Sequence, residues 1–128
     1  MSQIQYLLFD LDNTLYSYTS GLLSQLRMQI RHWLADALAI APDDAAVLSA
    51  RYSRDYGSTL GGILRHHPEL DPEAYLAAIH VVPVEDTLVP DPALAAMCAR
   101  LPYPKVIFTN SIREWSERVL GCLGVREH

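Results

Sequence analysis

The chain has 128 residues, of which 50% are hydrophobic and 20% are charged, a composition that excludes a disordered or collagen-like protein. Fifteen acidic residues against ten basic ones give a formal net charge of -5, which argues against a nucleic-acid polymer as partner. No apolar run reaches the ~18 residues of a membrane span. Asp10 and Asp12 also interrupt the segment where an export signal would need an apolar core, so we expect a cytoplasmic protein without membrane contact.

The first half of the chain predicts one short strand followed by helices. Residues 5–9 form an apolar run of strand length with acids directly after it, which is typical of a buried parallel strand. Apolar spacing predicts a helix over 20–41 and a second one over 42–56, with Gly57 suited to the left-handed position at its end. A third, shorter helix is predicted over 58–67.

The second half predicts two capped helices, a strand and a last helix. Asp71-Pro72 and Asp91-Pro92 each place an N-cap aspartate before a proline at the first helical position, so a helix should begin at both. A second strand is predicted over 105–108. We expect Ser111 to cap the last helix, which should stop near Gly124.

Polar side chains follow both predicted strands. Side chains alternate along an extended chain, so Asp10 and Asp12 should point to one side and Leu11 to the other. A divalent cation would relieve the repulsion between the two carboxylates, and Mg²⁺ suits a site made only of oxygen ligands. Ligands of open parallel sheets bind beyond the carboxyl ends of the strands, where Thr109 and Asn110 offer donors for phosphate oxygens.

This set of side chains permits phosphoryl transfer. One carboxylate would be the nucleophile, forming an aspartyl-phosphate, and the other would protonate the leaving oxygen. The alternative for the two acids is a solvated turn with no chemical role.

Two segments together resemble the haloacid dehalogenase (HAD) superfamily. The string Phe-Asp-Leu-Asp-Asn-Thr-Leu-Tyr over 9–16 is similar to its first motif, and Phe-Thr-Asn-Ser over 108–111 is similar to its second. Residues 56–63 and 90–94 look like parts of the helical cap of pyrimidine 5'-nucleotidases in this superfamily. The resemblance implies an α/β fold, a Rossmannoid parallel sheet that is incomplete here, with an inserted α-helical cap.

The resemblance also implies how the chain is divided. Residues 1–15 and 92–128 would form the partial Rossmannoid core, and residues 16–91 would form the cap.

The same resemblance implies roles for individual residues. Asp10 would be the nucleophile and Asp12 the general acid/base, with both holding Mg²⁺, Asp12 through its backbone carbonyl. Thr109 and Asn110 would hold the phosphoryl group, and Tyr56 is expected to line a substrate pocket between cap and core.

The expected activity is Mg²⁺-dependent hydrolysis of a small phosphate ester. The resemblance favours this over dehalogenation, because dehalogenases lack an acid at the position of Asp12. A pyrimidine nucleoside 5'-monophosphate is the expected substrate. A sugar phosphate or another small phosphate ester is the alternative.

The chain departs from the family pattern in two motifs. It has no counterpart of the third motif, a lysine, or of the fourth, an acidic pair, and its one lysine, Lys105, precedes the second strand. The alternative reading is therefore a catalytically incompetent fragment or binding module. About 50 residues make a marginal core, so we expect a truncated chain or an assembly that completes the sheet, with self-association through the open sheet edge.

Overall fold

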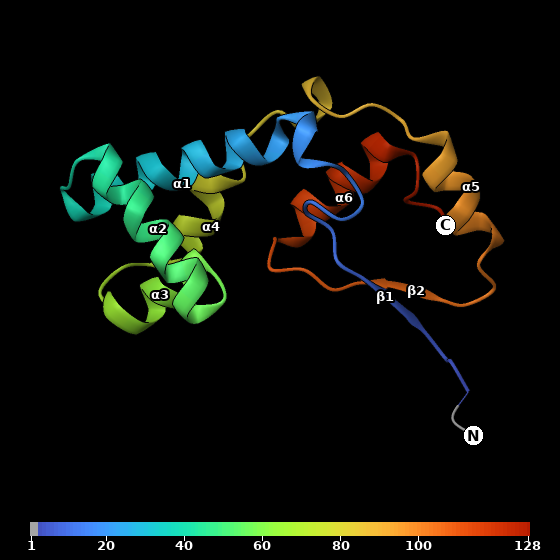
Figure 1. Cartoon of the computed structure of the whole chain (residues 1–128), viewed down its shortest axis with the longest axis horizontal. Coiled ribbons are helices and arrows are strands. Elements are labelled where there is room, and N and C mark those ends of the chain that lie inside the picture. The colour runs from blue at the N-terminus through green and yellow to red at the C-terminus, as the bar shows by residue number, and fades with distance from the viewer. Residues whose placement is uncertain (1–2) are drawn as a thin grey trace. The chain divides into compact units, whose positions relative to one another are not determined.

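The computed structural model describes residues 3–128 and contains short strands, helices and two 3-10 turns (Figure 1). In chain order the elements are β1 (Leu7–Phe9), η1 (Tyr18–Ser20), α1 (Leu22–Leu38), α2 (Pro42–Tyr56), α3 (Thr59–His66), α4 (Pro72–Ile79), η2 (Val84–Asp86), α5 (Pro92–Arg100), β2 (Lys105–Ile107) and α6 (Arg113–Leu123). Within the described residues, no helix is long and apolar enough to cross a membrane.

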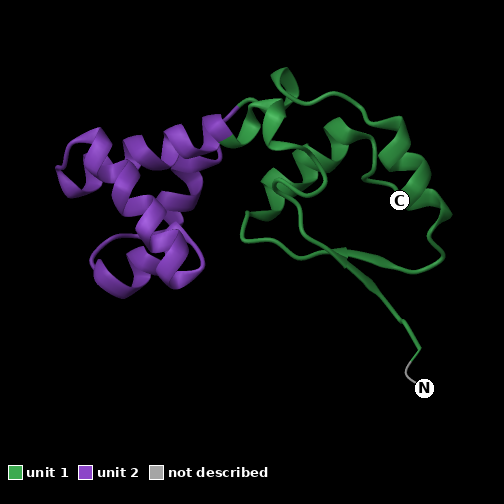
Figure 2. Ribbon diagram, in the orientation of Figure 1, with its two compact units in different colours: residues 1–23, 83–128 green, residues 24–82 purple. Residues whose placement is uncertain are grey.

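The chain packs as two compact units (Figure 2). One unit consists of Met1–Leu23 and Pro83–His128 and contains the sheet with α5 and α6. The other, Ser24–Val82, is helical and lies within the segment 16–91 that the sequence predicts to be an insertion. The chain therefore leaves the sheet unit once and returns to it once.

The sheet consists of β1 and β2, which run parallel with Leu8 opposite Val106. Side chains alternate between its faces, and Phe9 and Ile107 point towards the helices. Together with Cys98 of α5 they help to line a cavity of about 90 Å³ that α6 also borders. The predicted α/β class is confirmed, with helices forming most of the chain.

The opposite face of the sheet is exposed, so the prediction that the first strand is buried is wrong for this face. Leu8 is 68% exposed and Val106 43%, because α5 and α6 cover only the other side. Tyr6 and Phe108 continue the same apolar surface, at 61% and 76% exposure. A core this short contains too few helices to cover both faces of the sheet.

Helix α1 is shorter at both ends than the predicted 20–41. Gly21 adopts a left-handed conformation with φ of 86°, closing the η1 turn before the helix begins. Ala39 also has a positive φ, 52°, and stops the helix after Leu38. An L-residue rarely adopts this conformation, so the sequence contains no signal for a helix end at an alanine.

The two aspartate caps predicted from local sequence are confirmed. The Asp71 carboxylate accepts a hydrogen bond from the Glu73 N–H at 3.0 Å, and Asp91 accepts one from the Leu94 N–H at 2.9 Å. Helix α2 ends at Tyr56 and is followed by Gly57 with φ of 80°. These helix boundaries depend on side chains next to them in the sequence, which is why they could be predicted.

Helices α2 and α3 pack closely where Gly62 meets Tyr52. Both residues are buried, and a Cβ added to Gly62 would lie 2.0 Å from Cγ of the Tyr52 ring. The absence of a side chain at Gly62 therefore makes this approach possible.

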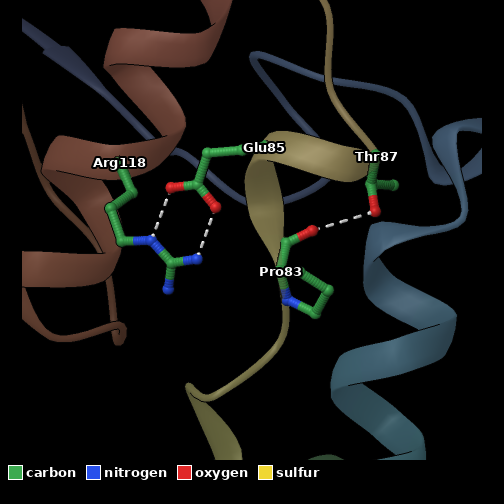
Figure 3. Close-up of polar contacts among 4 residues, drawn as sticks. All are labelled: Pro83, Glu85, Thr87 and Arg118. Atoms are coloured by element: carbon green, nitrogen blue, oxygen red, sulfur yellow. Dashed lines mark hydrogen bonds and ion pairs between the residues drawn. The ribbon is translucent and has the colours of Figure 1, made fainter.

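A charged pair fixes the segment in which the chain returns to the sheet unit (Figure 3). Arg118 of α6 donates to both carboxylate oxygens of Glu85 in η2, at 2.8 and 2.7 Å. The hydrogen bond from Arg118 lowers the pKa of Glu85 from 4.5 to about 2. The Thr87 hydroxyl also donates to the Pro83 carbonyl at 3.3 Å, so η2 is held at both of its ends.

Candidate active site

Polar residues leave the two strands at the same edge of the sheet. The Phe108 N–H donates to the Phe9 carbonyl at 2.8 Å, which continues the pairing to the ends of both strands. The next residues, Asp10 and Thr109, line an open cavity of about 310 Å³ with Asn110. The structure thus brings three of the four predicted catalytic and phosphate-binding residues together.

A tight turn carries the first motif. The Leu11 carbonyl accepts hydrogen bonds from the N–H groups of Thr14 and Leu15, at 3.2 and 3.0 Å. Asn13 has a φ of 58°, a left-handed conformation that asparagine tolerates better than most residues. Leu11 is fully buried while Asp10 is exposed, as alternation predicts for these two residues. Asp12, predicted to point to the same side as Asp10, is not among the residues that line the cavity.

Asp10 keeps one carboxylate oxygen available. Its Oδ2 accepts a hydrogen bond from the Thr14 hydroxyl at 2.7 Å. Its Oδ1 accepts none from residues 3–128. One oxygen is therefore held in place by Thr14, and the other is free to act on a ligand.

Asp12 is half-buried and accepts hydrogen bonds from three side chains. The Tyr16 hydroxyl lies 2.5 Å from Oδ1, and Nε1 of Trp115 lies 3.0 Å from the same oxygen. The Ser111 hydroxyl lies 2.6 Å from Oδ2. Burial and the hydrogen bond to Asp12 raise the pKa of Tyr16 far above its usual value, so this phenol stays protonated and donates.

Ser111 does not cap the last helix, so that prediction is wrong. Helix α6 begins at Arg113 with Ile112 in the cap position, and no side chain bonds to its first N–H groups. The Ser111 hydroxyl instead binds Asp12, and its backbone N–H donates to Oγ1 of Thr109 at 3.1 Å. Ser111 therefore connects the carboxylate of the first motif to the threonine of the second.

The sequence patterns gave neither Trp115 nor Tyr16 a role at the site. Both are buried, with exposed fractions of 1% and 6%. A buried tyrosine or tryptophan normally places its O–H or N–H on a partner. That polar hydrogen is the one sequence signal that could have suggested a link to Asp12.

Tyr56 and Lys105 each form hydrogen bonds with other residues. Tyr56 ends α2 in the helical unit, where its hydroxyl lies 2.6 Å from Nε2 of His66. Its place in a substrate pocket stays a prediction. Lys105 donates to the carbonyls of Leu101 and Tyr103, at 3.0 and 3.2 Å, at the end of β2 away from Thr109.

The chain's own oxygens fit part of a magnesium site. Within residues 3–128, no three Asp, Glu, His or Cys side chains converge to hold a metal ion. The two ligands that the resemblance implies are a carboxylate oxygen of Asp10 and the backbone carbonyl of Asp12. Oδ1 of Asp10 and that carbonyl accept no hydrogen bond from the described residues. Mg²⁺ commonly takes few protein oxygens and completes its shell with water and phosphate, so the two fit.

Comparison with known proteins decides the family. A sequence model of haloacid dehalogenase-like hydrolases matches residues 7–128. The chain belongs to this family. Haloacid dehalogenase-like hydrolases generally use Mg²⁺, in keeping with the two oxygens described above.

One relative carries a name that mentions phosphate. The chain is 26% identical over 127 residues to Phosphate metabolism protein 8 of Saccharomyces cerevisiae. The alignment covers 93% of the chain and 40% of that relative, so the chain spans less than half of the relative's length.

Proposed function

We propose that the protein hydrolyses phosphate monoesters through an aspartyl-phosphate on Asp10. The observation that carries this proposal is the shared cavity of Asp10, Thr109 and Asn110 at the carboxyl ends of two parallel strands. Membership of the haloacid dehalogenase-like hydrolases supports the same chemistry.

The proposed reaction has two steps. The free Oδ1 of Asp10 attacks phosphorus, the bond from phosphorus to the ester oxygen breaks, and Asp12 gives its proton to that oxygen. A water molecule then attacks the phosphorus of the aspartyl-phosphate and gives a proton to Asp12. The bond to Asp10 breaks, inorganic phosphate leaves, and both carboxyl groups return to their starting states.

Thr109 and Asn110 would hold the phosphoryl oxygens. Oγ1 of Thr109 accepts the Ser111 N–H, so the proton of the Thr109 hydroxyl remains available for donation. The Asn110 amide is exposed at the same cavity and can donate as well.

Metal dependence follows from the charges of the cavity. Its lining residues include no lysine or arginine, while the Asp10 carboxylate and a bound phosphate are both negative. Mg²⁺ held by the Asp10 carboxylate and the Asp12 carbonyl would supply the missing positive charge when bound. We therefore expect a chelator to abolish phosphate release.

We propose a pyrimidine nucleoside 5'-monophosphate as the substrate and the cytoplasm as the location. The support for the substrate is the likeness of residues 56–63 and 90–94 to the cap of pyrimidine 5'-nucleotidases. A sugar phosphate or another small phosphate ester is the alternative.

A second candidate is a module that binds phosphate without hydrolysing it. Lys105 lies at the far end of β2, and the described residues contain no cluster of three metal-binding side chains. Loss of one transition-state donor typically costs about 10²–10³ in rate, so a site without a lysine and further acids would turn over very slowly.

Phosphate release from uridine 5'-monophosphate with Mg²⁺ tests the proposal. The full chain should release phosphate, Asp10→Asn should abolish release, and Asp36→Asn, which changes an exposed carboxylate of α1, should leave it intact. Ribose 5-phosphate in parallel distinguishes the two substrate classes. Equal activity of the Asp10→Asn protein would refute the proposed nucleophile, and phosphate binding without release would favour the binding module.

A further inference from the structure

The geometry points to Ser111 as a positioning residue that aligns Asp12 with Thr109, an inference that rests on the proposed function. Its hydroxyl holds Oδ2 of Asp12 at 2.6 Å, and its N–H holds Oγ1 of Thr109 at 3.1 Å. One residue thus sets the distance between the group that would transfer a proton and the group that would hold the phosphoryl oxygens.

The two carboxylate oxygens of Asp12 have different hydrogen-bond partners. Oδ1 accepts hydrogen bonds from the Tyr16 hydroxyl and from the indole N–H of Trp115, which can only donate. Among residues 3–128, Oδ2 accepts its hydrogen bond from the Ser111 hydroxyl. Ser111 therefore holds one oxygen of the carboxylate, while Tyr16 and Trp115 hold the other.

This assigns separate tasks to the three partners of Asp12. Tyr16 and Trp115 fix the carboxyl group through Oδ1, while Ser111 keeps Oδ2 in place. The Ser111 hydroxyl itself exchanges no proton with the substrate.

Kinetics of matched variants provide the first test. Ser111→Ala removes the bond to Asp12 but keeps the N–H bond to Thr109. We expect kcat for uridine 5'-monophosphate to fall about tenfold to a hundredfold, as for other small misplacements of a reacting group, while KM stays the same. Ser111→Thr should restore kcat. Ser116→Ala is the control, since this buried hydroxyl of α6 donates to the Ile112 carbonyl and not to Asp12.

An NMR measurement tests the placement of Asp12 without turnover. The chain has two tryptophans, so its ¹H–¹⁵N spectrum contains two indole signals, which Trp33→Phe assigns. In Asp12→Ala the Trp115 Nε1–H signal should move upfield, and in Ser111→Ala it should also move, because the carboxylate reorients. In Ser116→Ala it should stay in place.

The outcomes separate this inference from the proposed function. An unchanged kcat in Ser111→Ala, or an unchanged Trp115 signal in that variant, overturns the positioning role. A wild-type chain without phosphatase activity refutes the proposed function, and the NMR spectra then decide alone whether Ser111 holds Asp12. A lower kcat with unchanged KM, rescue by threonine and a moved indole signal support the inference.

Discussion

Nε1 of Trp115 donates to Oδ1 of Asp12 at 3.0 Å, although 103 positions separate the two residues in the sequence. This bond joins the last helix of the sheet unit to the turn after its first strand. The indole ring itself is only 1% exposed, so Trp115 both fills the core and fixes a carboxylate. Core packing and site geometry therefore depend on the same side chain.

Replacing Trp115 by phenylalanine should destabilise the protein by about 1–3 kcal/mol, because a half-buried carboxylate loses a donor. Urea unfolding followed by circular dichroism measures the change. Trp33→Phe is the control, since Trp33 packs edge-on against Tyr75 at 5.1 Å and makes no hydrogen bond among the described residues. Equal losses in the two variants would show that the bond to Asp12 contributes nothing to stability.

Gly62→Ala should destabilise the helical unit by about 1–3 kcal/mol or more, because the new Cβ would overlap the Tyr52 ring. Gly121→Ala provides the opposite case. A Cβ at this exposed position of α6 meets nothing within 4 Å, so the variant should gain roughly 0.5–1 kcal/mol from higher helix propensity. Thermal unfolding of both variants measures the effects, and a Gly62→Ala protein as stable as wild type would contradict the packing of α2 on α3.

Ala39→Gly should stabilise the protein by about 0.5–1 kcal/mol, because glycine adopts the left-handed conformation of this residue without strain. Ala37→Gly should instead destabilise the protein, since Ala37 is an exposed residue inside α1 where glycine costs about 0.5–1 kcal/mol of stability. Urea midpoints of the two variants check this. A loss of stability in both would mean that Ala39 is helical in solution.

Glu85→Gln should lower the melting temperature slightly at neutral pH and not at all in strong acid. The hydrogen bond from Arg118 depresses the pKa of Glu85 from 4.5 to about 2. The pair therefore stabilises the fold fully above pH 4.5, and this contribution is lost as the pH falls towards 2.

Melting curves of wild type and Glu85→Gln between pH 2 and pH 7 measure this difference. Salt at about 1 M should also reduce it, because the pair is exposed. Glu127→Gln, at an exposed position near the C-terminal end of the sequence, is the control. A difference that is independent of pH would show that the loss comes from packing and not from charge.

Val106→Lys should suppress self-association through the uncovered sheet face. Apolar side chains from both strands are exposed there, and unpaired strand edges favour pairing with another chain. Sedimentation velocity should show a mass above 14.3 kDa that rises with concentration for the wild type and stays at the monomer value for the variant. Val47→Lys, on a 70% exposed residue of α2, should behave as wild type. A wild type that stays monomeric would rule out this contact.

The parts of the fold that the sequence predicts are those with local causes. Asp71 and Asp91 cap the helices that follow them because each carboxylate reaches an N–H two or three residues away. The helix end at Ala39 had no such signal, since any alanine would look helical there. Exposure of Leu8 depends on which helices cover the sheet, and that is decided by tertiary packing.

The candidate site also contains features that the sequence predicts and features that only the tertiary structure decides. Alternation along the first strand and the order of elements predicted that Asp10 and Thr109 would share a sheet edge. Ser111 could serve either as a helix cap or as a partner of a distant carboxylate, and only the fold decides between them. Two of the three partners of Asp12, Ser111 and Trp115, lie about a hundred residues away, beyond the reach of local patterns, whereas Tyr16 lies four residues away.

The long-range bonds of Asp12 have a consequence for protein synthesis. The helical unit, Ser24–Val82, is continuous in sequence and can fold as soon as the ribosome has released it. The Asp12 carboxylate cannot accept its hydrogen bond from Ser111 until that residue, 99 positions later, has been synthesised. At roughly 5–20 residues per second this delay is about 5–20 s, so the helical unit can be complete while the Asp12 carboxylate still lacks its long-range partners.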